Sequence, residues 1–239
     1  METTGSLVRK LFSNITPTYD FLNRFLSFGA DQRWRAKGTR LLPHGADVRV
    51  LDLACGTLDL ALAYLKQGEG EVFGVDFAMP MLEAGRRKAV GVRKPVLGSR
   101  LKVVCGDGLQ LPFPDHFFDA AMCAWGVRNF SDNAAGLKEM RRVLKPGGLF
   151  LVLEFFKPST PIGKIFSKTY GRYVMPVLGG WISKNKKAYE YLNRSIQKFL
   201  SQKEYEKLLT DTGFEIRRSK NLSGGISSLI LAQNCECNS

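Results

Sequence analysis

The amino-acid sequence predicts an α/β fold built on a largely parallel sheet, with helices on both faces. From residue 48 onward, short apolar runs alternate with stretches of helical periodicity, which is the pattern of consecutive βαβ units. The first three predicted strands also carry an aspartate at or just past their ends, namely Asp52, Asp76 and Asp107. Because the carboxyl ends of parallel strands meet at one edge, we expect these carboxylates to lie together.

The stretch from Val50 to Asp59 predicts a strand, a tight turn and the start of a helix. Its apolar first half suits a buried parallel strand, and Leu60 to Leu65 give the following helix an apolar face. Gly56 permits a backbone shape, or a close approach of a ligand, that a Cβ atom would hinder. A ligand site is therefore expected at this turn.

The other elements follow in chain order. Before the first strand, residues 7–26 predict two short amphipathic helices interrupted at Pro17, Gly29 and Asp31 predict a turn, and residues 34–42 predict a helix that ends before Pro43. Further strands are expected at residues 70–76, 101–105, 118–125, 148–154, 214–219 and 227–232. Further helices are expected at residues 80–89, 133–144, 186–199 and 203–212.

A chain of 239 residues with 44% apolar content suits one large domain with a lid. We expect a helical lid at 1–45, a cofactor-binding core at 46–154, a substrate-side insertion and helix at 155–200, a C-terminal helix and strand hairpin at 201–234, and a tail at 235–239. The sequence contains no apolar run of the roughly 20 residues that span a bilayer, and its start lacks the layout of a signal peptide. A cytoplasmic location is therefore expected.

The cysteines and histidines predict neither a disulfide framework nor a metal site. The five cysteines are odd in number, and Cys235 and Cys237 are separated by one residue, whereas zinc knuckles use two to four. The only histidines, His44 and His116, lie beside loop-forming residues. We therefore expect no metal.

The net charge of +13 requires an explanation. No acidic residue occurs between Glu154 and Glu190, where lysines and arginines alternate with large apolar side chains. This mixture favours peripheral contact with an anionic membrane surface, at the inner face of the membrane, over nucleic acid, although a solvated face remains the alternative. A homodimer is also left open.

The three strand-end carboxylates indicate the kind of cofactor. Asp76 follows Asp52 by 24 residues, close to the offset at which an acidic residue of a nucleotide-binding βαβ unit binds ribose hydroxyls. The sequence lacks a phosphate-binding glycine loop, so an acidic site of this kind suits a cofactor that has no phosphates and carries positive charge. S-adenosylmethionine, with its ribose, sulfonium and amino group, is such a cofactor.

Two signature stretches carry a resemblance to a known family. The first runs from Tyr19-Asp20-Phe21-Leu22-Asn23 to Trp34, and the second runs from Arg142 through Lys145-Pro146-Gly147-Gly148 to Glu154. Gly126-Val127-Arg128-Asn129 and Tyr191 to Ile196 are also family-like. From Val8 to Ala232 the chain resembles the ubiquinone/menaquinone biosynthesis C-methyltransferases, within the class I, Rossmann-like methyltransferases.

The resemblance implies a mixed seven-stranded sheet with a reversed last hairpin, a helical lid and an insertion after the fifth strand. It implies methyl transfer from S-adenosylmethionine to a ring carbon of a prenylated quinol, either demethylmenaquinol or the related ubiquinone precursor. Asp76 is expected on the ribose, Asp107 near the adenine, and Gly56 under the cofactor. The other expected cofactor residues are Asp52, Ala54, Thr57, Asp59, Phe77, Met81, Gly108 and Trp125.

The chain departs from the family pattern at three places. Asp31 stands where the motif has His, Leu58 stands where the glycine loop usually has a second Gly, and Leu229 to Leu231 replace a common His-x-Gly. The first departure bears on the substrate or the proton acceptor. The second is expected only to narrow the loop.

Four residues are candidates for the chemistry. Arg128 and Asn129 are expected to polarise a quinol hydroxyl, which makes the neighbouring ring carbon nucleophilic. Asp31 or Tyr19, on the lid, is expected to take the proton.

Three alternatives to quinol methylation remain open. The first is methylation of another small or lipid substrate, and the second is a non-catalytic partner in quinone biosynthesis. The third, an RNA-binding protein, lacks the signature of a base-stacking sheet.

Overall fold

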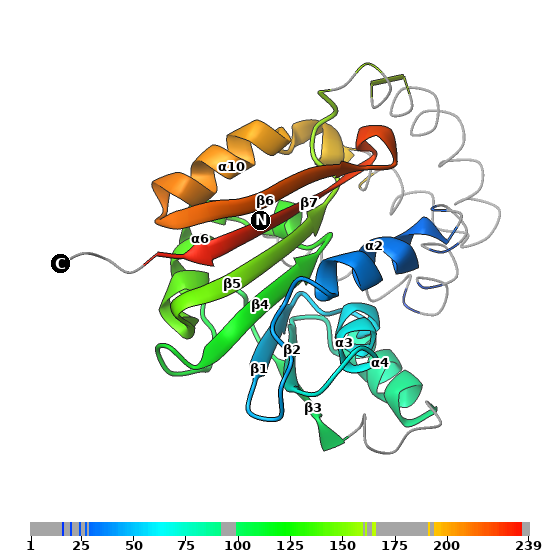
Figure 1. The fold of residues 1–239 in the computed structure, drawn as a ribbon. Helices are drawn as coiled ribbons and strands as arrows, with labels where there is room; N and C mark the ends of the chain where they lie inside the picture. The colour runs from blue at the N-terminus through cyan, green and yellow to red at the C-terminus, as the bar shows by residue number, and fades with distance from the viewer. Residues whose placement is uncertain are drawn as a thin grey trace, which may run out of the picture.

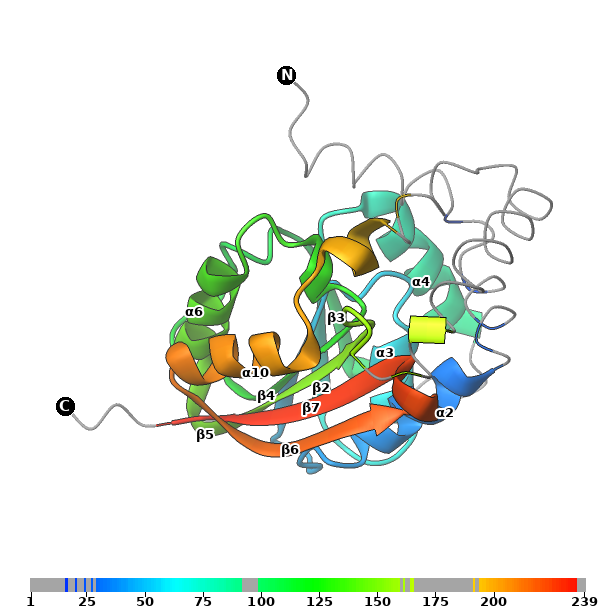
Figure 2. The same cartoon turned by 90° about the horizontal axis from the view of Figure 1, so that it is seen from above.

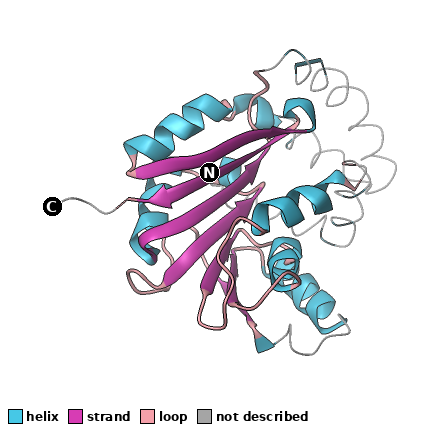
Figure 3. Ribbon diagram, in the orientation of Figure 1, coloured by secondary structure: helices cyan, strands magenta, loops and turns pink. Residues whose placement is uncertain are grey.

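A seven-stranded sheet forms the centre of the protein in a computed structural model (Figures 1 and 3). The structure describes residues 16, 20, 24, 27, 29–91, 99–159, 161, 164–165, 191 and 194–235. The strands are β1 (Arg49–Leu53), β2 (Glu71–Asp76), β3 (Leu101–Cys105), β4 (Phe118–Ala124), β5 (Leu144–Glu154), β6 (Phe214–Leu222) and β7 (Ser227–Asn234). The helices are α2 (Ala30–Thr39), α3 (Asp59–Leu65), α4 (Met79–Gly91), α6 (Asn133–Val143) and α10 (Gln202–Asp211), with 3-10 turns η1 (Val127–Asn129) and η3 (Ser223–Gly225).

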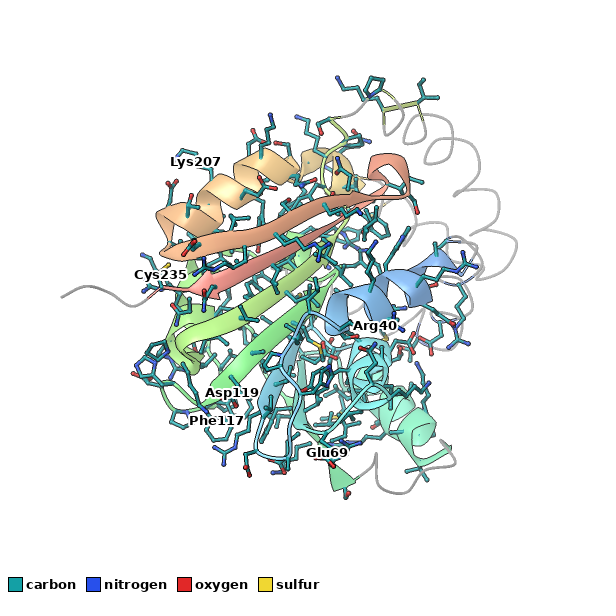
Figure 4. All side chains as sticks on the ribbon, viewed as in Figure 1. Arg40, Glu69, Phe117, Asp119, Lys207 and Cys235 are labelled. Carbon is teal, nitrogen blue, oxygen red and sulfur yellow. The ribbon has the colours of Figure 1, made fainter. Side chains whose placement is uncertain are left out.

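The strand order β3-β2-β1-β4-β5-β7-β6 confirms the predicted fold class. Strands β1 to β5 pair in parallel, and β7 pairs antiparallel with both β5 and β6, so the last hairpin is reversed. The loops that follow β1, β2, β3 and β4 therefore share one edge of the sheet. In Figure 4 the labelled residues Glu69, Phe117 and Asp119 mark the opposite, amino-terminal edge.

Helices cover both faces of the sheet (Figure 2). Helices α2, α3 and α4 bury Trp34, Tyr64 and Leu82 against one face. Helices α6 and α10 bury side chains such as Met140 and Tyr205 against the other. Each large apolar side chain removed from water contributes about 1.5–3 kcal/mol, so the two layers hold the sheet rigid beneath the loops at its carboxyl edge.

Two elements begin four residues earlier than the sequence predicts. Helix α2 begins at Ala30, after Gly29 with φ of +72°, because Asp31 suits the first turn of a helix and pairs with Arg35 four residues later. Strand β5 begins at Leu144, which pairs with Phe118 across an irregular register that absorbs the Lys-Pro-Gly-Gly turn. The predicted helices at 7–26 and most of the insertion at 155–200 lie outside the described residues.

Candidate functional site

The loop after β1 has an unusual backbone that directs its amide groups. Ala54, Gly56 and Leu58 have φ angles of +54°, +52° and +67°, in the left-handed region that favours glycine. A non-glycine residue in this region costs about 1–3 kcal/mol, and such strain is concentrated at functional sites. The Gly56 N–H donates to Oδ2 of Asp76 over 2.9 Å. The loop after β1 and the end of β2 are thus joined where both predicted cofactor residues lie.

Asp76 ends β2 as predicted and is only 8% exposed. Its second oxygen, Oδ1, accepts from the Ala78 N–H over 2.8 Å. Burial raises the pKa of Asp76, and the amides of Ala78 and Gly56 oppose this rise. Each carboxylate oxygen has lone pairs beyond these two bonds, so Asp76 retains the capacity to accept from ribose hydroxyls.

Asp52 lies beneath the loop, with 1% of its surface exposed. Its Oδ2 accepts from the N–H of Ala61 in the first turn of α3 over 3.0 Å. Burial raises the pKa of Asp52 to about 8, against the effects of that amide and of Arg35. Asp52 therefore positions the start of α3.

Asp107 and Gly108 reach the same edge from β3. Asp107 is exposed, and its Oδ1 accepts from the Leu109 N–H over 2.9 Å. A Cβ atom at Gly108 would lie 3.1 Å from Cδ1 of Leu53, so a larger residue would press this turn against β1. The Gly106 N–H donates to the Asp76 carbonyl over 3.1 Å, which aligns the ends of β2 and β3.

A small pocket of about 30 Å³ opens at the strained loop. Among the predicted cofactor residues, it is lined by Asp52, Ala54, Gly56, Thr57, Asp59 and Trp125. Arg35, Cys55, Leu60 and Ala124 complete the lining. Asp76, Phe77, Met81, Asp107 and Gly108 lie on neighbouring segments outside this lining.

Arg35, which was not among the residues predicted from sequence, is the buried cation of this pocket. Its Nη1 bonds to Asp31 and lies 3.7 Å from Oδ2 of Asp59, and the guanidinium lies 4.6 Å from the Trp125 ring centroid. Arg35 Nε and Trp125 Nε1 have no hydrogen-bond partner within the described part of the chain. An orphaned buried donor costs about 1–3 kcal/mol, so the pair indicates a place for a ligand acceptor.

A second cation, Lys88 of α4, joins three side chains around the loop. Its Nζ lies 2.6 Å from Oδ1 of Asp59 and 2.5 Å from Oδ2 of Asp20, and it donates to Oγ1 of Thr57 over 3.1 Å. The Thr57 hydroxyl donates to Asp20 over 2.5 Å. Burial acts to raise the pKa of Asp59, but Arg35 and Lys88 outweigh it and lower that pKa. Thr57 and Asp59 thus tie the segment before α2 to the loop.

The aromatic wall of the pocket comes from Trp125, which follows β4 with φ of +56°. Its ring stacks on Phe155 at a centroid distance of 5.4 Å and lies 6.2 Å from Trp34. Gly126 permits this packing, since a Cβ there would lie 2.6 Å from Cβ of Ala54. The loops after β1 and β4 therefore touch through two small residues.

Arg128 and Asn129 lie in η1, directly after this wall. Nη1 of Arg128 donates to Oε1 of Glu154 over 2.6 Å and to the Trp125 carbonyl over 2.5 Å, while its Nε has no partner among the described residues. Asn129 Oδ1 accepts from the Tyr191 hydroxyl over 3.1 Å. Burial raises the pKa of Tyr191, and Arg128 opposes this effect. Arg128 and Asn129 thus form a second polar group on the same sheet edge.

Two of the remaining candidate residues, Asp31 and Met81, are buried beside the loop after β1. Asp31 is buried, and its carboxylate accepts from Arg35 and, over 2.8 Å, from the Ser27 hydroxyl, so it touches the pocket through Arg35. Met81 is buried, and its Cε would lie 3.4 Å from a Cβ atom at Gly56, while Phe77, four residues earlier, is half-buried. Tyr19 lies outside the described residues.

Local sequence patterns gave no reason to select Arg35, Lys88 or Glu154. Most of their partners lie on other elements: Lys88 pairs with Asp59 of α3, 29 positions away, and with Asp20 in the segment before α2. One signal was available, because Asp31 and Arg35 stand at the i, i+4 spacing of a helical ion pair. The residue types around Asp31 instead predicted a turn, and the structure places Asp31 inside α2.

The fold and the site together define the class I methyltransferases. A mixed seven-stranded sheet presents carboxylates, a glycine turn and an aromatic wall at one edge. A family model described as the ubiE/COQ5 methyltransferase family matches residues 1–233. The chain belongs to this family and is an S-adenosylmethionine-dependent methyltransferase.

Two relatives and one solved structure illustrate the likeness. The demethylmenaquinone methyltransferase of Thermus thermophilus is 45% identical over 208 residues, which cover 87% of this chain and 92% of the relative. The ubiquinone/menaquinone biosynthesis C-methyltransferase UbiE of Geobacter sulfurreducens is 41% identical, covering 94% and 87% respectively. The geranyl diphosphate C-methyltransferase of Streptomyces coelicolor A3(2) superposes with a TM-score of 0.60 over 86% of this chain and 77% of its own. Its 17% identity supports the shared fold alone.

Two features are absent from the described residues. No helix in this part of the chain has the length and hydropathy needed to cross a bilayer. The same residues contain no group of three or more His, Cys, Asp or Glu side chains arranged to hold a metal ion.

Proposed function

We propose that the protein methylates a ring carbon of a prenylated quinol, with demethylmenaquinol as the first candidate and the related ubiquinone precursor as the second. The two relatives named above carry these activities in their names. The observation that carries the proposal is Arg128, a buried guanidinium with an unpartnered Nε among the described residues, at the same sheet edge as the cofactor loop. A quinol oxygen is an acceptor that suits this donor.

The residues of the pocket fit the cofactor. Arg35 supplies a buried cation with a free donor for the amino-acid carboxylate of the cofactor, and Asp59 supplies negative charge for its ammonium and sulfonium. Asp76 takes the ribose hydroxyls, Asp107 and Gly108 border the adenine, and Trp125 closes the side that faces the substrate. When bound, the cofactor supplies an electrophilic methyl group on a positively charged sulfur.

Arg128 and Asn129 act on the acceptor. Arg128 stabilises negative charge on the quinol oxygen, which raises electron density on the neighbouring ring carbon. With the cofactor bound, that carbon would take the methyl group, a neutral thioether would leave, and the ring carbon would release its proton to a base. Asn129, held by Tyr191, orients the second polar edge of the ring.

Asp31 and Tyr19 remain the candidates for the proton acceptor. Asp31 is an ion-paired carboxylate bound to Arg35 and Ser27, so in this role it would act through a water or after a shift of α2. Asp31→Asn distinguishes the two residues. If Asp31 takes the proton, Asp31→Asn should lower kcat by about 100-fold or more, whereas a role for Tyr19 predicts a kcat close to that of the natural protein.

The decisive experiment is turnover with labelled S-adenosylmethionine and a panel of reduced naphthoquinols and benzoquinols. Arg128→Ala should lower kcat by about 100-fold, the usual scale for removing one charge-stabilising donor. Arg49→Ala is the matched control, because Arg49 is exposed at the amino-terminal edge of the same sheet. Unchanged methylation by Arg128→Ala would remove this residue from the mechanism, and methylation of no quinol would favour another small or lipid substrate.

The prenyl chain of the proposed substrate suggests the cellular location of the protein. We place it in the cytoplasm, in peripheral contact with the inner face of the membrane, where a prenyl chain is embedded. The net charge of +13 supports attraction to anionic lipid. Flotation with anionic and with neutral vesicles tests this, and absence from both would contradict it. A homodimer is a further proposal that light scattering decides.

A further inference from the structure

We propose that Glu154 is a positioning residue that fixes the guanidinium of Arg128, so that its Nη1 is held by the protein and its Nε is presented to the substrate oxygen. The inference rests on the proposed function, since it deepens the role of Arg128 there. Glu154 is the last residue of β5, and Arg128 lies in η1 after the neighbouring strand β4. Two adjacent strand ends are therefore joined by one ion pair.

The contacts of Glu154 form a complete set around both carboxylate oxygens. Oε1 accepts from Nη1 of Arg128 over 2.6 Å and from the Phe155 N–H over 2.6 Å. Oε2 accepts from the backbone N–H of Arg128 over 3.3 Å. One carboxylate thus binds both the main chain and the side chain of Arg128, which sets the direction in which this side chain leaves the turn.

The arrangement divides the donors of Arg128 into two groups. Nη1 has two hydrogens, and its two bonds, to Glu154 and to the Trp125 carbonyl, use both. Nε is buried without a partner among the described residues, and the guanidinium lies 5.8 Å from the Phe155 ring centroid. A fully satisfied arginine would have a structural role only. This arginine instead keeps one costly donor, Nε, without a partner among the described residues.

Burial makes the anchor strong but also dependent on its partner. Glu154 is 0% exposed and the Arg128 side chain is 5% exposed, so each charge relies on the other for compensation. Burial raises the pKa of Glu154, while Arg128 and the Phe155 amide lower it. The other titratable groups that sense Glu154 are Cys123 of β4 and Tyr205 of α10, and burial raises the pKa of both.

The test replaces Glu154 by Gln, which keeps the shape and removes the charge. We expect kcat to fall by about 10–100-fold, because a misplaced catalytic group costs up to about 100-fold, while the Kd of S-adenosylmethionine stays within about 2-fold. Glu139→Gln is the matched control, because Glu139 binds Arg142 over 2.7 Å in a comparable carboxylate–guanidinium pair on α6.

A double-mutant cycle separates this inference from the proposed function. If Arg128→Ala leaves kcat unchanged, the proposed role of Arg128 fails. If Arg128→Ala lowers kcat and Glu154→Gln does not, only the positioning inference fails. If both single changes lower kcat, Glu154→Gln must have no further effect in the Arg128→Ala background, and an equal fall in both backgrounds would overturn the inference.

Arg128→Lys keeps the test open if Glu154→Gln does not fold. Lysine preserves the positive charge and the pairing with Glu154 but has no Nε donor in a planar fork. We expect a folded protein that binds the cofactor normally and has the low kcat of Arg128→Ala. A kcat equal to that of the natural protein would show that presentation of Nε is unnecessary, which overturns the inference.

Discussion

Nζ of Lys88 lies 2.5 Å from Oδ2 of Asp20, and this pair joins α4 to the segment that precedes α2. The same ammonium lies 2.6 Å from Asp59, so one cation balances two carboxylates beside the cofactor loop. The three side chains are 15–26% exposed, between the surface and the interior. Lys88 therefore links the segment before α2 directly to the loop after β1.

Lys88→Met should lower the free energy of unfolding by about 1–2 kcal/mol, between the values for exposed and for buried ion pairs. The sign of the pH dependence of this loss follows from the pKa of Asp59. Burial acts to raise that pKa, but Arg35 and Lys88 outweigh burial and lower it. A carboxyl group whose pKa is lower in the folded state stabilises the fold at any pH above its pKa in the unfolded state. This stabilisation is lost as the pH falls through its pKa in the folded state. The deficit of Lys88→Met should thus shrink in acid. Urea denaturation at several pH values measures the stability deficit of Lys88→Met. Lys66→Met is the control, because Lys66 is exposed, and equal stability of the two variants would contradict the prediction.

Asp52 predicts a second pH effect with the opposite sign. Burial raises its pKa to about 8, with Asp76 and Asp59 adding to the rise and Ala61 and Arg35 opposing it. The folded state therefore holds a proton that the unfolded state releases near pH ~4, and the free energy of unfolding falls as pH rises from about 4 to about 8.

Asp52→Asn should remove this dependence. The variant should be close to the natural protein in stability at about pH 4 and more stable than it at about pH 8.5, because it never has to bury a charge. Other buried carboxylates are present in both proteins, so the difference between the two urea midpoints isolates Asp52. A constant difference across the range would show that Asp52 titrates normally.

Gly56 offers a direct test of the loop. Its φ of +52° strains any other residue, and a Cβ atom would meet Cε of Met81 at 3.4 Å. Gly56→Val should raise the Kd of S-adenosylmethionine by more than about 100-fold, because β-branched residues are poorest in the left-handed region and the bond to Asp76 is lost with the turn. Calorimetry measures the binding and thermal unfolding checks the fold.

Gly147→Val is a matched control for this change. Gly147 also has positive φ, +76°, and a Cβ there would meet only Gln233 Nε2 at 3.5 Å among the described residues, in the turn inside β5. It should lose stability through the same backbone strain and keep its affinity for the cofactor. Equal loss of affinity in both variants would mean that strain alone, and not the place of Gly56 in the site, reduces binding.

The predictions from sequence succeeded where local periodicity decides the structure. Strand β3 matches the predicted 101–105, and Asp52, Asp76 and Asp107 lie at strand ends on one edge. The ion pairs of the site could not be predicted from the sequence. Glu154 and Arg128, for example, are 26 positions apart, and no local pattern encodes their contact. Nothing in the sequence indicated that Leu58 adopts a backbone conformation typical of glycine. Tertiary packing supplies that information.

Leu58 therefore leads to the last prediction, which concerns how the loop tolerates its missing glycine. Its side chain is 0% exposed and fills space left by two glycines. A Cβ atom at Gly85 of α4 would lie 2.7 Å from Cγ of Leu58, and one at Gly74 of β2 would lie 3.0 Å from Cδ2. The leucine thus does more than narrow the loop, because it packs α4 against the sheet and offsets the strain of its backbone.

A double-mutant cycle with Gly85 measures this packing. Gly85→Ala alone should destabilise the protein by about 1–3 kcal/mol through overpacking, and Leu58→Ala alone by about 2–5 kcal/mol through a cavity. Together they should cost clearly less than the sum. Leu58→Ala removes the side-chain atoms that a Cβ atom at position 85 would meet, and alanine in a helix is about 1 kcal/mol more favourable than glycine. The carbonyl carbon of Thr57 would still lie 3.0 Å from that Cβ atom, which limits the relief of the overpacking. Gly38→Ala is the control, because its Cβ atom would lie 3.0 Å from Cδ2 of Leu151 and its cost should add to that of Leu58→Ala. If the costs of Gly85→Ala and Leu58→Ala also add, the proposed packing is contradicted.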